Sequence, residues 1–75
     1  MNKTRRQQLK KWLNEMEVIK SELENICSDE EECFDNIPEN LQSSERASDS
    51  EEAINQMNEA VSSIEDAMSM IEEIV

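Results

Sequence analysis

Apolar residues in the first half of the chain recur at alternating intervals of three and four residues. The row consists of Leu9, Trp12, Met16, Ile19, Leu23, Ile26, Cys33 and Ile37. This spacing is the a/d pattern of a heptad repeat, which predicts an amphipathic helix over residues 3–36. The residues Leu13, Cys27 and Phe34 widen the apolar stripe at neighbouring e positions. Glu30 occupies one core position of this row. Three interpretations are open: Glu30 fixes the register of the helix packing, it pairs with Arg46, or it marks the point where the contact between helices opens.

The second half of the chain follows the same spacing and predicts a second helix over residues 48–74. Its apolar row is Ile54, Met57, Val61, Ile64, Met68, Ile71 and Val75. Beside this row, Ala53, Ala60 and Ala67 recur one heptad apart. Such small residues let a second helix approach closely, or they serve only as strong helix formers.

The connection between the helices covers residues 37–47. Pro38 disfavours a helical conformation at Ile37, so the first helix should end near Asp35 or Asn36. Two serines are candidate caps of the second helix: Ser44, and Ser48, which heads an S-x-x-E capping box. We adopt the later start. Leu41 is expected to plug the end of the core.

A connection of this length favours an antiparallel arrangement of the two helices. The predicted fold is therefore all-α, a coiled-coil-like helical hairpin that forms a single domain over residues 1–75. This arrangement would also place Lys10 and Lys11 beside Glu72 and Glu73, each pair opposing its own helix dipole.

Two helices share only one seam, which cannot cover all the apolar side chains of this chain. The surplus residues are Trp12, Leu13, Val18, Phe34 and Met70. We expect the hairpin to form a homodimer, a four-helix bundle that buries this surplus. The alternative is that the same surface docks an unknown protein partner.

The composition lacks the residue types that most catalytic sites require. The chain has no Gly, His or Tyr, so it lacks a phosphate-binding glycine loop, the commonest general base and the commonest metal ligand. The acidic run at residues 28–35 has no Gly for a calcium loop. Cys27 and Cys33 are expected to be reduced thiols, and the acidic surroundings of Cys33 disfavour a nucleophilic thiolate. We therefore expect no enzyme activity, no cofactor, no metal and no catalytic residue.

Charge is distributed very unevenly. The net charge is −12, yet the first eleven residues carry five cations, which leaves −17 on the remainder. Such a body is repelled by nucleic acid and anionic membranes, and no apolar run approaches the roughly 18 residues of a membrane span. A cytoplasmic protein is expected. The alternative function is that of an acidic inhibitor whose carboxylates imitate nucleic-acid phosphates on a host enzyme or defence system.

Residues 31–46 read EECFDNIPENLQSSER. This segment resembles the F-D-N-L-P-E-x-L-Q-x-S-E-R-G segment of a small uncharacterised helical family of Firmicutes phages, prophages and conjugative elements. Ala47 stands where the family has Gly. The resemblance implies a helical hairpin in a mobile-element setting and carries over no catalytic residue.

The polar connection has two interpretations. In the first, Asn36 and Ser44 cap the helices, and Arg46 pairs with Asp35 or Glu39. In the second, the loop is a binding epitope. The candidate interaction residues are Trp12, Leu13, Phe34, Asp35, Asn36, Glu39, Gln42, Glu45 and Arg46. The predicted function is that of a non-catalytic protein–protein interaction or structural protein of a phage or mobile element.

Overall fold

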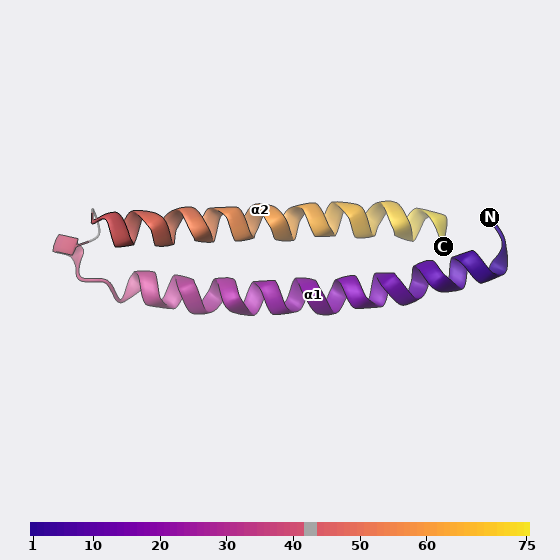
Figure 1. Ribbon diagram of the computed structural model, residues 1–75, viewed down its shortest axis with the longest axis horizontal. Coiled ribbons are helices and arrows are strands. Elements are labelled where there is room, and N and C mark those ends of the chain that lie inside the picture. The colour runs from indigo at the N-terminus through magenta and orange to yellow at the C-terminus, as the bar shows by residue number, and fades with distance from the viewer. Residues whose placement is uncertain (42–43) are drawn as a thin grey trace.

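The computed structural model describes residues 1–41 and 44–75 and contains two long helices that lie side by side (Figure 1). Helix α1 spans Lys3–Asp35, the short 3-10 helix η1 spans Glu39–Leu41, and α2 spans Glu45–Ile74. The long helices run antiparallel and form a rod of 59 × 15 × 13 Å. The predicted all-α hairpin is confirmed.

Polar side chains and the backbone cap α1 at both ends. The side chain of Asn2 accepts a hydrogen bond from the backbone N–H of Arg5 at 2.8 Å. At the other end Asn36 is the C-cap, and its N–H donates to the carbonyl oxygen of Glu32 at 3.2 Å. The helix therefore ends two residues before Ile37, the residue that Pro38 restricts.

Ser44 caps α2, which begins three residues earlier than the expected start at residue 48. The Ser44 hydroxyl accepts a hydrogen bond from the N–H of Ala47 at 3.3 Å. Ser48 already lies inside the helix, because its N–H donates to the Ser44 carbonyl at 3.0 Å. The earlier of the two candidate serines is thus the cap.

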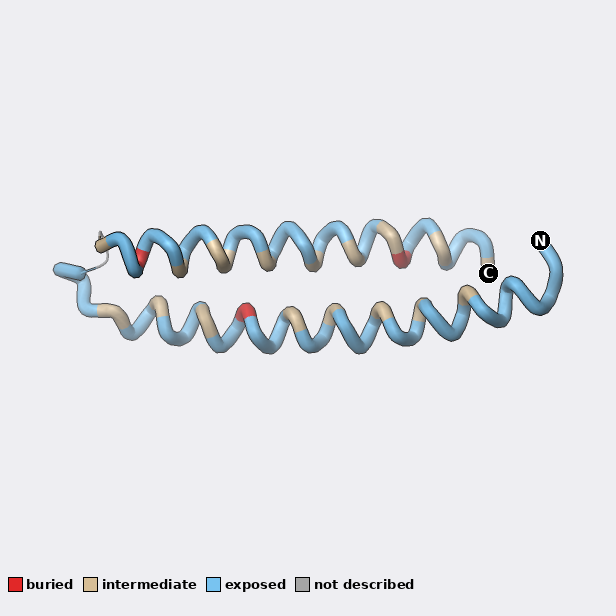
Figure 2. Tube along the Cα trace, viewed as in Figure 1, coloured by how far each residue is buried: buried red, intermediate tan, exposed pale blue. Residues whose placement is uncertain are grey.

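The buried and half-buried residues lie on the facing sides of the two helices (Figure 2). On α2 and at its C-cap these seam residues are Ala47, Ser50, Ile54, Met57, Val61, Ile64, Met68, Ile71 and Val75, which include the whole predicted row. Beside them on α2, Ala53 and Ala67 are also half-buried. On α1 and just beyond it they are Leu9, Leu13, Met16, Lys20, Leu23, Cys27, Glu30, Phe34 and Ile37. Both sets keep the alternating heptad spacing.

The heptad pattern of α1 placed two rows in the seam, one that begins at Leu9 and one that begins at Trp12. The prediction was wrong for the second row. The residues expected in the seam, Trp12, Ile19, Ile26 and Cys33, are exposed. Their places are taken by the next residues along the chain, Leu13, Lys20, Cys27 and Phe34. Two members of the seam row contact α2 through polar groups, since Lys20 pairs with Glu65 and Cys27 lies against Asn58.

Lys20 connects the two helices near the middle of the rod. Its Nζ lies 3.7 Å from Glu17, 3.9 Å from Glu24 and 3.8 Å from Glu65. The Lys20 side chain is mostly covered, so its methylene groups fill the seam while the ammonium reaches the carboxylates at the surface.

At the loop end, Ala47 is the most deeply buried residue, with none of its surface exposed. This position lies in the first turn of α2, so Ala47 sits in ordinary helix. Leu41 does not plug the core as expected, because half of its surface is exposed.

Replacing Lys20 with Glu should lower the free energy of unfolding by about 1–2 kcal/mol, because three attractive ion pairs become repulsive. The matched control is Lys3→Glu, which makes the same charge change at the first residue of α1, where an anion favours the helix dipole. Urea denaturation followed by circular dichroism measures both variants. Equal stability of the two variants would contradict the seam position of Lys20.

Candidate interaction surface

Two flanks with different chemistry run along the seam. The first is marked by the contacts of Lys20 with Glu17, Glu24 and Glu65 and by the contacts of Cys27 described below. We call it the acidic flank, and its residues are Glu17, Glu24, Glu31, Asn58 and Glu65. The seam has two sides along the rod. The residues on the side away from the acidic flank form a second flank.

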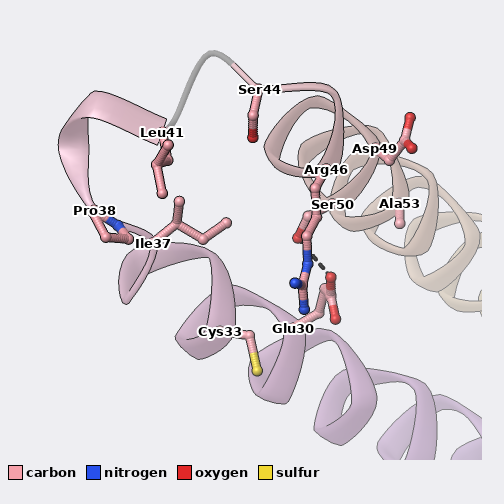
Figure 3. Close-up of a pocket in the computed structure, with 10 residues that line it drawn as sticks. All are labelled: Glu30, Cys33, Ile37, Pro38, Leu41, Ser44, Arg46, Asp49, Ser50 and Ala53. Atoms are coloured by element: carbon pink, nitrogen blue, oxygen red, sulfur yellow. Dashed lines mark hydrogen bonds between the residues drawn. The ribbon is translucent and has the colours of Figure 1, made fainter.

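The second flank is apolar. On each helix its residues directly precede seam residues, and we call it the apolar flank: Trp12, Ile19, Ile26 and Cys33 of α1, and Ala53, Ala60, Ala67 and Ile74 of α2. Cys33 and Ala53 line the same hollow, which places the two rows on one side of the rod (Figure 3).

Large side chains on this flank face solvent. Trp12 is 57% exposed, Ile19 53% and Ile26 55%. Single exposed apolar residues are ordinary on protein surfaces, but an aligned row at heptad spacing is a contiguous patch of the kind found at protein–protein contacts. The alanine row beside it leaves the backbone of α2 open to close approach.

The apolar flank ends in a hollow of about 540 Å³, which we call the loop-end hollow (Figure 3). Its lining residues are Glu30, Cys33, Ile37, Pro38, Leu41, Ser44, Arg46, Asp49, Ser50 and Ala53. The wall is mixed, with apolar groups from the end of α1 and η1 and charged groups from both helices.

Within the hollow, the hydroxyl of Ser50 donates a hydrogen bond to the Glu30 carboxylate at 2.6 Å (Figure 3). This hydrogen bond gives the Glu30 carboxylate a partner at its position in the seam and joins α1 to α2. Ser50 is a partner that none of the three sequence interpretations of Glu30 named.

Arg46 also lines the hollow. Among the residues that the structure describes, it makes no ion pair with Asp35 or Glu39, because each ion pair found there is made by Lys20. The structural interpretation of the loop holds for its caps, Asn36 and Ser44. It does not hold for the proposed Arg46 pair.

Cys27 is the buried thiol of the seam. Its Sγ lies 3.5 Å from the Glu31 carboxylate, 3.5 Å from the side-chain oxygen of Asn58 and 3.9 Å from the carbonyl oxygen of Ile54. Burial raises the pKa of this thiol above its usual 9.0, and the hydrogen bond and negative charge of Glu31 raise it further. Cys27 therefore acts as a neutral hydrogen-bond donor.

The opposite end of the rod carries the basic tip, which we define as Lys3, Arg5, Arg6, Lys10 and Lys11. The Nζ of Lys11 lies 5.1 Å from the centroid of the Trp12 ring, a cation–π distance. Both chain termini lie at this end of the rod (Figure 1). Yet in residues 1–41 and 44–75 no ion pair joins the basic tip to Glu72 or Glu73.

The predicted interaction residues are divided between the surface and the seam. Leu13 and Phe34 are half-buried in the seam, whereas Trp12 lies on the apolar flank. The exposed residues around the loop end are Asp35, Asn36, Glu39, Glu45 and Arg46. Gln42 lies outside the described residues.

Sequence reasoning missed Ile19 and Ile26 as surface residues because it assigned them to the seam. The sequence did contain a signal for this surface row, because Ile19 and Ile26 follow Trp12 at intervals of seven residues.

In the parts of the chain that the structure describes, no group of three metal-binding side chains comes together. No helix there carries an apolar stretch long enough to cross a bilayer.

The Cys33→Ser variant isolates the Cys27 thiol for a reactivity test. Its alkylation by iodoacetamide at pH 8 should be at least about tenfold slower in buffer than in 6–8 M urea, because burial and the raised pKa suppress the thiolate. The reciprocal Cys27→Ser variant, which retains the exposed Cys33, reports the rate for an accessible thiol. A Cys27 thiol that reacts equally fast in buffer and in urea would contradict its seam position.

No model of a known protein family matches the chain, and comparisons with curated proteins and with solved structures likewise gave no match.

Proposed function

We propose that this chain is a non-catalytic protein–protein interaction protein that works as a homodimer. Two hairpins pack through their apolar flanks and form a four-helix bundle. The observation that carries this proposal is the exposed row of Trp12, Ile19 and Ile26 at heptad spacing.

The width of the apolar stripe on α1 supports self-association. A helix in a two-stranded coiled coil needs two apolar positions in each heptad, whereas a helix in a bundle uses about three. The third row of α1 begins at Trp12, and α2 supplies its counterpart in Ala53, Ala60 and Ala67. Large side chains on one helix and small ones on the other give a second hairpin a surface into which it can pack.

The resemblance of residues 31–46 supports a phage, prophage or conjugative element as the setting of this function. Within that setting the dimer would present its acidic flanks to other proteins. The alternative of a nucleic-acid mimic has weaker support, because the ammonium of Lys20 partly neutralises Glu17, Glu24 and Glu65 in the middle of the acidic flank.

Ile19→Lys should weaken self-association at least about tenfold, because it places a charge in the centre of the proposed interface. Val18→Lys is the matched control. Val18 is 57% exposed and adjacent in sequence. By heptad position it lies on the side of α1 opposite the seam, so this dimer leaves it exposed, contrary to the expectation that the dimer would bury it. Sedimentation equilibrium over a range of concentrations measures the dissociation constant of each variant and of the unmodified protein.

The proposal requires a dimer in the unmodified protein and in Val18→Lys, and a shift towards monomer in Ile19→Lys. A monomer at every concentration, or equal dissociation constants for the two variants, would overturn it. Circular dichroism of both variants should show unchanged helix content, since each substitution changes an exposed position.

A further inference from the structure

The arrangement of charge and shape along the apolar flank also specifies the orientation of the second copy. We infer that the two hairpins lie head to tail, so that Trp12 of each copy enters the loop-end hollow of the other. The basic tip of each copy then meets the acidic loop end of the second, which comprises Glu32, Asp35, Glu39, Glu45 and Asp49. This inference rests on the proposed dimer.

The apolar flank has a symmetric layout that fits a two-fold axis across the rod. Trp12 and Cys33 lie equally far from the point between residues 22 and 23, and so do Ile19 and Ile26. A two-fold axis at this point sets Ile19 of one copy against Ile26 of the other. It also sets Trp12 against Cys33, which lines the hollow.

The three alanines of the α2 row have the same centre, and Ile74 lies beyond them. Ala60 lies midway between Ala53 and Ala67. The contacts of Lys20 with Glu65 and of Glu30 with Ser50 fix the alignment of the helices and place residues 22 and 23 of α1 beside Ala60. One two-fold axis therefore relates both rows to their copies, with the alanine rows of the two α2 helices in close approach.

Charge selects this orientation over the parallel one. The five cations of the basic tip make no ion pair within the described part of the chain, while the loop end concentrates carboxylates. A head-to-tail dimer brings opposite charges together at both ends of the bundle. A parallel dimer would bring the two acidic loop ends together, which is unfavourable, and would keep each basic tip away from the loop-end carboxylates.

The loop-end hollow has the chemistry to receive Trp12 together with its neighbouring cations. Its apolar wall contains Ile37, Pro38 and Leu41, and its carboxylates are Glu30 and Asp49. Lys11 lies over the Trp12 ring and therefore arrives with it. An aromatic anchor in a pocket, with a charge pair at its edge, is the usual form of an interface hot spot.

Zero-length cross-linking of the unmodified protein tests the orientation. A carbodiimide joins lysine amines to carboxylates in direct contact, and peptide mass spectrometry identifies the joined residues. Head-to-tail dimers should yield links from Lys10 or Lys11 to Asp35, Glu32 or Glu39. These links must join two chains, because Lys11 and Asp35 are about 36 Å apart along one helix.

The Lys20–Glu65 ion pair, at 3.8 Å, is the internal control for the coupling reaction. Links from Lys10 or Lys11 only to Glu72 and Glu73 in a dimeric sample would overturn the head-to-tail orientation. The absence of tip-to-loop links in a dimeric sample with the control link present would do the same. A sample that is monomeric by sedimentation would instead overturn the proposed function, so the two failures are distinguishable.

The Trp12→Ala variant tests the occupant of the hollow. We expect at least a tenfold rise in the dissociation constant, comparable with the loss of a hot-spot side chain. Val18→Ala, which truncates a side chain of the same fractional exposure, is the control and should leave the constant within about twofold. An unchanged constant for Trp12→Ala would remove Trp12 from the contact and overturn the inference.

Discussion

The structure depends on which row of α1 the seam with α2 covers. Two adjacent rows have the heptad spacing for this place, and the seam takes the row of Leu13, Lys20, Cys27 and Phe34. The more apolar row, which begins at Trp12, stays on the surface. The chosen row is held by contacts across the seam, namely the Lys20–Glu65 ion pair and the polar contact between Cys27 and Asn58. The apolar flank follows directly from this choice, because the row that the seam does not cover remains exposed.

The sequence was sufficient for the coarse fold and insufficient for the register of α1. Heptad spacing and Pro38 predicted the two helices, and the short connection predicted their antiparallel return, because these signals are local. The two candidate serines left the start of α2 open, and the later start that we adopted was wrong. The choice between Trp12 and Leu13 for the seam is not local. It depends on how the whole length of α1 packs against α2, and a rule that assigns the most apolar row to the core gives the wrong answer. The hydrogen bond from Ser50 to Glu30 is likewise a contact between distant segments.

The candidate surface was only partly predictable, because the residues it exposes depend on the register of α1. Trp12 was identified as surplus apolar surface, whereas Ile19 and Ile26 were hidden by the wrong register. The loop end combines two separate roles. Asn36 and Ser44 end and begin helices, while Arg46 faces the hollow without pairing to Asp35 or Glu39. The proposed dimer explains the uneven charge of the chain, because the basic tip of one copy lies against the loop-end carboxylates of the other.

The most direct test of this account is small-angle X-ray scattering with light scattering on the same chromatographic peak. The account predicts a mass near twice 8.7 kDa and a longest dimension that stays close to the 59 Å of one hairpin, because the flanks pack side by side. A mass of 8.7 kDa at all concentrations would show that the apolar flank does not bind a second copy. A doubled mass with a doubled length would show that the copies join at their ends and not along the flank.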